Sequence, residues 1–363
     1  MIVERDFAGF AFPFAAGITA VMILDFHLWT AFHIPAAASI LMSAVSVLLL
    51  AHPAHRTWDR HLVTALIIIA ALGCGTLTGT THRLISVSSY HGETFVPQWI
   101  SGLGDKLGEI IKALPFKDSG TAGIINALIT GDRTGIPPEV TSAFRNSGAS
   151  HILSLSGLHL GIIYGFLNFI FKILGNSRNA VRSRAVLTIL ACGLYTAATG
   201  AGASITRAFL FILIRETARV TGRYADTAGV LMTALVIQLV LSPGDVVNAG
   251  FQLSYAAMAG IAFIFPRLKG LWPEGRGGLM KWMWNSAAMS IACQITTGPI
   301  AYLYFGTFPV HFLLTNLVAV PLTGIIIPLS LLNVVGICPD TLIPATEFLM
   351  ECMRDSLEII ASM

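Results

Sequence analysis

Long apolar runs, separated by shorter polar or charged stretches, recur along the whole chain. A helix needs about 20 apolar residues to cross the hydrocarbon core of a membrane, because it must satisfy its own backbone hydrogen bonds there. We predict membrane spans at residues 7–28, 34–51, 62–81, 151–172, 185–200, 204–221, 227–242, 247–266, 284–304 and 310–332. The pattern therefore predicts an all-α fold, a polytopic integral membrane helical bundle of about ten transmembrane helices.

This pattern divides the chain into four regions. Residues 1–81 are expected to form an N-terminal region of three membrane helices, and residues 82–150 an extracytoplasmic segment with an amphipathic helix. Residues 151–340 are expected to form the membrane core, and residues 341–363 an amphipathic, charged tail that does not cross the membrane. The first apolar run is too long for the core of a signal peptide and lacks a cleavage pattern, so we expect it to be retained.

The extracytoplasmic segment contains the amphipathic helix. Apolar residues from Ile100 to Leu114 recur at helical spacing, while charged residues fall elsewhere on the helical wheel. A helix lying on the membrane surface and a helix covering other helices of the protein both explain this pattern. The apolar stretch 121–131 is too short to span, and a second short helix is predicted to start at Pro138.

Positive charges follow the predicted topology. Most Lys and Arg residues fall in segments that are cytoplasmic if the N-terminus lies inside, whereas the short outside loops such as 201–203 and 305–309 carry none. Cytoplasmic loops of membrane proteins are enriched in Lys and Arg, so the N-terminus is predicted to be cytoplasmic. Arg215, Arg219 and Arg223 repeat every four residues and are explained most simply as cytoplasmic anchors.

The composition agrees with a membrane protein. Apolar residues make up 55% of the chain, charged residues only 11%, and the mean hydropathy is +0.75, whereas a soluble domain carries about a quarter charged residues. The net charge of +3 is small and does not indicate a nucleic-acid-binding protein in the way that a strongly basic soluble domain would, so any contact with DNA must be local. The five cysteines contain no C-x-x-C pair and predict neither a disulfide framework nor a zinc site.

The stretch 150–161 is the most unusual, because it places two histidines, three serines and two glycines at the entrance to a predicted span. On a continuous helix His151 and His159 lie about 80° apart, which is unsuitable for binding one metal ion. We expect no metal and no cofactor. The simplest expectation is that these polar groups form hydrogen bonds within the bundle.

Ser156 and His159 also raise the alternative of an intramembrane hydrolase with a serine nucleophile. The surrounding residues match neither G-x-S-x-G nor G-x-S-G, and a nucleophile and its base must meet by geometry rather than by sequence spacing. We therefore expect no enzymatic activity, and the hydrolase remains an alternative.

Several motifs occur in a fixed order between residues 120 and 325. They are N-A-L-I-T-G-D-R at 126–133, F-R-N-S-G at 144–148, H-I-L-S-L-S-G-L-H-L-G at 151–161, A-S-I-T-R-A at 203–208, G-F-Q-L-S-Y-A at 250–256, and Y-F-G at 304–306 followed by N-L-V-A-V-P at 316–321. Together they resemble the competence domain of the ComEC family. The resemblance implies a channel that carries single-stranded DNA across the bacterial cell membrane during natural transformation, with residues 151–340 as its core.

The resemblance also implies conduit residues and partners. The candidate conduit residues are His151, Ser154, Ser156, Gly157, His159, Arg207, Gln252 and Asn316. Arg207 could contact phosphate in the pore or extend its side chain to the nearby outer surface. The expected partners are the transported single-stranded DNA, a DNA receptor outside, a cytoplasmic DNA motor or single-strand-binding protein, the lipid bilayer, and other copies of the chain in a homo-oligomer.

Two features depart from the family pattern. Full-length members usually carry an extracytoplasmic OB-like domain, for which residues 82–119 are too short, and a metallo-β-lactamase-like domain, whose H-x-H-x-D-H run does not occur here. There is accordingly no basis for expecting nuclease activity. A small-solute transporter using Asp25 and the polar groups of the spans, and a non-catalytic scaffold, remain as further alternatives.

Overall fold

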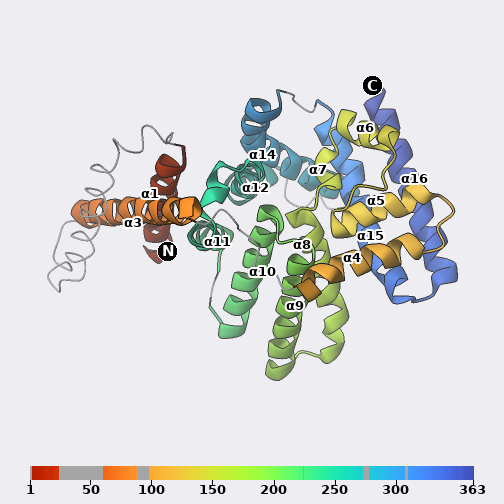
Figure 1. Ribbon diagram of the computed structural model, residues 1–363, viewed down its shortest axis with the longest axis horizontal. Helices are drawn as coiled ribbons and strands as arrows, with labels where there is room; N and C mark the ends of the chain where they lie inside the picture. The colour runs from red at the N-terminus through yellow and green to blue at the C-terminus, as the bar shows by residue number, and fades with distance from the viewer. Residues whose placement is uncertain (1, 24–59, 89–97, 224, 273–277, 307–309) are drawn as a thin grey trace. The chain divides into compact units, whose positions relative to one another are not determined.

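The computed structural model describes residues 2–23, 60–88, 98–223, 225–272, 278–306 and 310–363 (Figure 1). Their secondary structure is entirely helical, which confirms the all-α fold class for this part of the chain. Three helical stretches are long and apolar enough to cross a membrane, namely Gly157–Leu174, Ala249–Lys269 and Phe312–Val335. They coincide with the spans predicted at 151–172, 247–266 and 310–332. The total of about ten spans stays a prediction, and the span at 34–51 lies outside the described residues.

The chain divides into two compact units. The first comprises residues 1–94 and 225–255, and the second comprises residues 95–224 and 256–363. The helices of the first unit are α1 (Ile2–Ile23), α3 (Arg60–Ser88), α11 (Thr227–Leu241) and the beginning of α12 (Ala249–Ala259).

Helices α1 and α3 pack backbone to backbone because glycines face each other at their crossing. A Cβ atom added to Gly75 would lie 2.1 Å from the carbonyl oxygen of Phe14, and one added to Gly17 would lie 2.3 Å from that of Leu72. Small residues allow membrane helices to approach in this way, and dispersion contacts between the backbones then stabilise the pair.

Substituting Gly75 with alanine is expected to destabilise the protein by about 1 to 3 kcal/mol, since the new methyl group must displace a backbone. The matched control is Gly102→Ala on the second unit's first helix, where an added Cβ meets no atom within 4 Å. That control should be neutral or stabilising by up to about 1 kcal/mol, because alanine favours helices. The measurement is unfolding of the purified protein in detergent, and equal effects of the two substitutions would contradict the close crossing.

The second unit contains the remaining helices. They are α4 (Gln98–Ala113), α5 (Ser119–Thr130), α6 (Pro138–Asn146), α7 (Ser150–Leu153), α8 (Gly157–Ile170), α9 (Arg178–Ala198), α10 (Ala203–Thr221), the end of α12, α13 (Phe265–Lys269), α14 (Leu279–Phe305), α15 (Phe312–Val335) and α16 (Pro339–Ala361).

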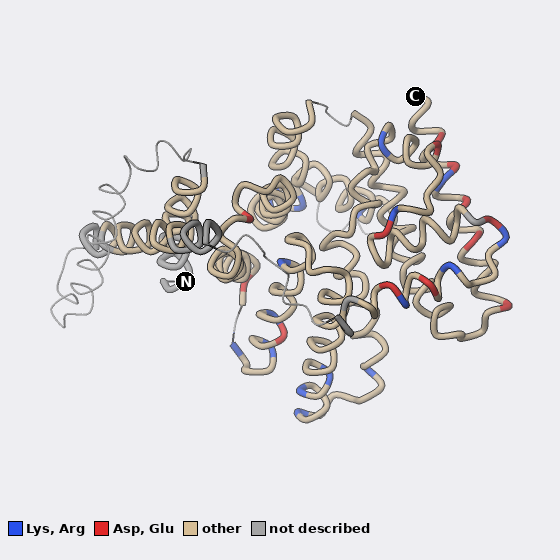
Figure 2. The backbone as a smooth tube through the Cα atoms, viewed as in Figure 1, with Lys and Arg blue, Asp and Glu red and all other residues tan. Residues whose placement is uncertain are grey.

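Helices α8, α9 and α10 lie side by side (Figure 1) and follow one another directly in the chain. The exposed face of α9 carries Val186, Leu187, Leu190 and Leu194, which are 43% to 63% exposed. A continuous apolar face of this kind is unfavourable in water and suited to lipid. Lys and Arg residues gather toward one end of these helices (Figure 2), as expected for a cytoplasmic end.

The short apolar stretch predicted not to span forms α5, and residues 120–129 are all buried. It packs against α4, α7 and α15 in the main apolar core. Of the two interpretations left open for the amphipathic helix, the structure favours packing within the protein. Ile111 of α4 is fully buried in that core, and a Cβ added to Gly104 would lie 2.3 Å from the carbonyl oxygen of Ala198 on α9.

The expected tail forms α16, which runs antiparallel to α15. Asn333 of α15 donates a hydrogen bond to Thr346 at 2.9 Å, and Thr323, nearer the start of α15, contacts Met353, nearer the end of α16. Glu347 also accepts a hydrogen bond from the backbone of Lys117, so the tail helix joins the segment between α4 and α5. Residues 339–361 are thus part of the second unit's core.

Candidate functional site

The helix that was expected to begin at residue 151 is broken. Helix α7 ends at Leu153, Ser154 is extended with φ −90° and ψ 130°, Ser156 is extended with φ −135° and ψ 171°, and α8 starts at Gly157. The Ser154 hydroxyl donates to the carbonyl of His151 at 2.9 Å. Serine side chains compete with helical backbone bonds in this way, which favours the break. The angle of about 80° between the histidines assumed a continuous helix, so that argument was wrong.

Ser156 and His159 form a capping box at the start of α8. The Ser156 backbone N–H donates to Nδ1 of His159 at 3.2 Å, and the Ser156 hydroxyl lies 3.0 Å from the same nitrogen. His159 is fully buried. Because Nδ1 accepts from a backbone amide, the proton of the neutral ring lies on Nε2. The serine and histidine therefore satisfy the backbone N–H groups of Ser156 and His159, and the N–H groups of Gly157 and Leu158 at this half-buried helix start have no intrahelical acceptor.

Arg207 lies beside this helix start. A Cβ added to Gly157 would lie 3.1 Å from Nη2 of Arg207 and 3.2 Å from the Cβ of Ala208, so the absent side chain of Gly157 leaves room for α10. Arg207 is only 5% exposed, and its Nη2 lies 3.5 Å from the hydroxyl of Ser204. The guanidinium is therefore held inside the helical packing next to the N-terminus of α8.

Other predicted motifs converge on the same break. Arg133 donates through Nε to the carbonyl of Leu153 at 3.1 Å. On the α15 side, Thr315 donates to the carbonyl of Ser147 at 2.6 Å, and this bond brings the start of α15, where Asn316 follows Thr315, to the segment just before α7. Segments separated by up to 168 residues thus surround the turn between α7 and α8.

Seven of the eight candidate conduit residues belong to the second unit and lie on or near the turn between α7 and α8. The eighth, Gln252, belongs to the first unit. Its amide donates to the carbonyl of Val246 at 2.9 Å and so stabilises the turn before α12. Asp25, considered for a transporter, lies outside the described residues. Among the residues that the structure covers, no three His, Cys, Asp or Glu side chains are grouped to hold a metal ion.

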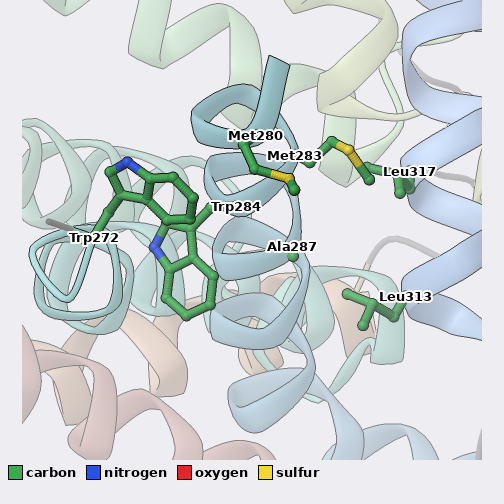
Figure 3. Close-up of a pocket in the computed structure, with 7 residues that line it drawn as sticks. All are labelled: Trp272, Met280, Met283, Trp284, Ala287, Leu313 and Leu317. Carbon is green, nitrogen blue, oxygen red and sulfur yellow. The ribbon is translucent and has the colours of Figure 1, made fainter. Parts of the chain in front are cut away.

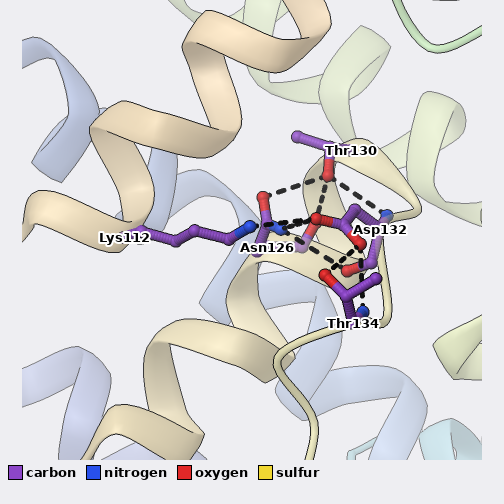
Figure 4. A network of polar contacts seen from close by, with 5 residues as sticks. All are labelled: Lys112, Asn126, Thr130, Asp132 and Thr134. Atoms are coloured by element: carbon purple, nitrogen blue, oxygen red, sulfur yellow. Dashed lines mark hydrogen bonds and ion pairs between the residues drawn. The ribbon is translucent and has the colours of Figure 1, made fainter.

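The motif ending in G-D-R forms a network around Asp132 (Figure 4). One carboxylate oxygen accepts from Lys112 at 3.1 Å and Asn126 at 3.0 Å, and the other accepts from the backbone and hydroxyl of Thr134 at 3.0 and 2.7 Å. The hydrogen bonds from Thr134 and Lys112 lower the pKa of Asp132 well below its ordinary value of 3.8. The network thereby anchors the loop that carries Arg133.

This shift predicts a pH dependence of stability. A carboxylate whose pKa is lowered by folding stabilises the folded state above its ordinary pKa and loses that contribution as the pH falls toward the folded value. Asp132→Asn should therefore destabilise the protein at pH 7, and the difference from the wild type should shrink below about pH 4. Thermal unfolding from pH 7 to pH 3 tests this, with exposed Asp105→Asn as the control. A difference that does not change with pH would contradict the role of the charge.

The sequence interpretation missed Glu216, which is 1% exposed. Its carboxylate accepts a hydrogen bond from the hydroxyl of Tyr164 on α8 at 2.5 Å and pairs with Arg219 at 2.6 Å. The sequence did contain an indication of this site. Glu216 is the one acidic residue in the predicted span 204–221, whose other charged residues are arginines, and ionisable residues within membrane helices are rare and often functional. Near their starts, Gly157 of α8 lies beside Arg207 of α10. Further along, Tyr164 of α8 is bonded to Glu216 of α10. The two helices therefore run parallel.

The interface between these helices is layered. Arg207 and the capped start of α8 form one polar layer, and Tyr164 with Glu216 forms another. Between them an apolar cluster contains Leu160, Cys192 and Ile212. A buried arginine and a buried glutamate are thus separated by hydrocarbon along the same helix pair.

These features define an all-helical membrane protein with polar groups buried between its helices. Residues 128–363 match the family described as Competence protein, and the chain belongs to that family. It is 29% identical over 204 residues to ComE operon protein 3 of Bacillus subtilis, covering 55% of this chain and 24% of the relative. It is 28% identical over 217 residues to Competence protein ComA of Neisseria gonorrhoeae, covering 58% and 30%. The chain thus spans less than a third of either relative. No solved structure matches it.

Proposed function

We propose that this chain forms part of a conduit for single-stranded DNA through the bacterial cell membrane during natural transformation. Membership of the competence protein family supports a role in DNA uptake. The observation that carries the conduit itself is the broken helix at Ser154–Ser156 with the buried Arg207 beside it.

The chemistry of this turn suits a phosphate group. The backbone N–H groups at a helix N-terminus and the helix dipole attract anions, and discontinuous membrane helices use such ends to bind charged substrates. Arg207 adds a full positive charge next to the same end. A strand that loses its hydration in a pore requires donors and cations of this kind. His151, Ser154, Ser156 and Asn316 add polar groups around the turn.

The proposed direction of transport follows the positive charges. The N-terminus lies in the cytoplasm, Arg207 lies toward the outer side, and Arg215, Arg219 and Arg223 lie toward the cytoplasm. A receptor outside delivers the strand, and a cytoplasmic motor or single-strand-binding protein draws it in. The chain guides the strand passively, without catalysis, alone or as a homo-oligomer.

The test is uptake of labelled DNA by competent cells that lack this gene and by the same cells complemented with it. The proposal requires that the deletion abolish cytoplasmic label while DNA bound at the cell surface remains. Complementation should restore entry. Undiminished entry into the deletion strain would sink the conduit proposal for this chain.

A hydrolase remains the second candidate, because Ser156 and His159 lie within hydrogen-bond distance. Against it, the lone pair that a general base would use already accepts a backbone N–H, and His159 is buried. The capping role accounts for both side chains. The hydrolase is therefore tested with variants of Ser156 that keep the helix cap but remove the nucleophilic hydroxyl.

Asparagine caps helices as well as serine does but cannot act as the nucleophile. Ser156→Asn is therefore expected to retain stability and uptake, whereas Ser156→Ala should lose about 1 kcal/mol of stability through the missing cap. Unfolding of the purified variants and uptake in complemented cells provide the two measurements. If Ser156→Asn folds normally but is inactive, a chemical role of the serine is supported.

A further inference from the structure

An apolar pocket of about 270 Å³ opens between α14 and α15 (Figure 3). Met280, Met283 and Trp284 project from the first turns of α14, and Leu313 and Leu317 come from the first turns of α15. Its lining consists of Trp272, Met280, Met283, Trp284, Ala287, Leu313 and Leu317. This pocket is separate from the turn between α7 and α8 and is not used by the proposed conduit.

The lining determines which ligand fits. Trp284 donates its indole N–H to the carbonyl of Leu268 at 3.2 Å, and its ring lies 6.1 Å from that of Trp272 at an angle of 32°. Apart from the two indoles, the lining side chains are hydrocarbon or thioether. A nucleobase would lose the hydration of its polar edges here without replacement, whereas a hydrocarbon chain loses nothing. The two tilted rings are also too close for a base to enter between them.

Two lysines lie close in the sequence to residues that line the pocket. Lys281 directly follows Met280, Lys269 ends α13, and both are exposed. The nearby Arg267 donates to the carbonyl of Phe263 and so is directed back along its own helix. The sequence holds no acidic residue at 256–272 or 278–306, and Glu274 and Arg276 fall in the stretch between them. The charge of this surface therefore complements an anion.

Exposed apolar side chains lie close to these lysines in the sequence. Leu271 is 68% exposed and Leu279 is 73% exposed. Tryptophan, exposed apolar residues and lysine occur together where a protein meets the boundary between lipid tails and headgroups. Basic pockets between membrane helices bind anionic headgroups.

We propose that this pocket binds an anionic phospholipid, with one acyl chain against Trp272, Trp284 and the methionines and the phosphate beside Lys269 and Lys281. The lipid would hold α15 against the start of α14. Because α15 also carries Asn316, the lipid would stabilise the helix that borders the candidate conduit. This binding does not depend on the proposed transport of DNA.

Quenching of tryptophan fluorescence by brominated lipids tests the proposal in a background in which Trp29, Trp58, Trp99 and Trp282 are replaced by phenylalanine, so that only Trp272 and Trp284 of the pocket report. The full chain is reconstituted with brominated phosphatidylglycerol or with brominated phosphatidylcholine carrying the same acyl chains. Each lysine near an anionic lipid contributes about fivefold in affinity, so the two together predict a preference of roughly 30-fold for phosphatidylglycerol. Trp284→Phe should remove much of the quenching and so assign it to this pocket.

Lys269→Gln with Lys281→Gln is expected to reduce the preference to near unity, while the control pair Lys106→Gln with Lys172→Gln, exposed lysines elsewhere, leaves it unchanged. Ala287→Phe, which fills the pocket, should reduce quenching by both lipids. Equal quenching by the two lipids of the protein that retains only Trp272 and Trp284 would overturn the proposal. So would a preference that survives the loss of both pocket lysines, or stronger protection of the tryptophans by a single-stranded oligonucleotide than by phosphatidylglycerol. None of these measurements involves transport, so the conduit proposal can fail while this one holds.

Discussion

Replacing Arg207 with alanine is expected to reduce the entry of DNA into the cytoplasm by roughly 10- to 100-fold, with binding at the cell surface unchanged. A hydrogen bond to a charged group contributes about 1.5 to 3 kcal/mol, and 1.4 kcal/mol corresponds to a factor of ten. Arg207 is buried next to the N-terminus of α8, where the low dielectric strengthens its attraction for phosphate. Its loss removes a full positive charge from that helix start.

The matched control is Arg215→Ala, which removes an exposed arginine two turns further along the same helix. This variant should retain most of the uptake. Arg207→Lys keeps the charge but not the planar fork of donors, and an intermediate rate is expected from it. Immunoblots of the membrane fraction must show equal amounts of each protein. Equal uptake by Arg207→Ala and Arg215→Ala would contradict a specific role for the buried arginine.

The second large effect is expected at Glu216. Substitution with alanine should lower the free energy of unfolding by about 2 to 3 kcal/mol, because it leaves the Tyr164 hydroxyl without its acceptor and Arg219 without its partner. Breaking a fully buried ion pair costs about 3 to 5 kcal/mol. The loss expected at Glu216 is smaller, because the Arg219 side chain is 37% exposed and solvent partly screens its charge. Chemical unfolding in detergent measures the change.

Two further variants separate the contributions at this site. Glu216→Gln retains an acceptor for Tyr164 and should be less destabilising than Glu216→Ala. Adding Arg219→Gln to Glu216→Gln removes the unpaired cation, so the double variant should recover part of the loss. Stability within about 0.5 kcal/mol of the wild type for Glu216→Ala would contradict a structural ion pair, since such small changes are typical of ordinary surface positions.

Glu216 also illustrates why the local sequence was insufficient to predict a buried ionic site. Arg215, Arg219 and Arg223 repeat every four residues, and this repeat is explained fully by cytoplasmic anchoring. One acid among them resembles an ordinary surface pair. Its importance depends on Tyr164, which lies 52 residues earlier and on another helix. No property of the α10 sequence specifies that neighbour.

The break between α7 and α8 is a related case. Ser154 and Ser156 have modest intrinsic effects on a helix, and an apolar run containing them was interpreted as one continuous span. The extended conformation is supported by bonds from elsewhere, including that of Arg133 to the Leu153 carbonyl. The polar composition of 150–161 identified the right place but could not determine its geometry.

The sequence by itself determined the all-helical membrane class, the family, the short length of α5 and the motifs that surround the turn before α8, because hydropathy, helical period and ordered motifs are local properties. Only the tertiary structure decided that Gly157 admits Arg207, that His159 caps its own helix, that Glu216 is buried against Tyr164, and that α4 and α16 pack into the core. These facts depend on which helix faces join, and that choice minimises exposed polar groups and unfilled space over the whole bundle rather than within any one segment.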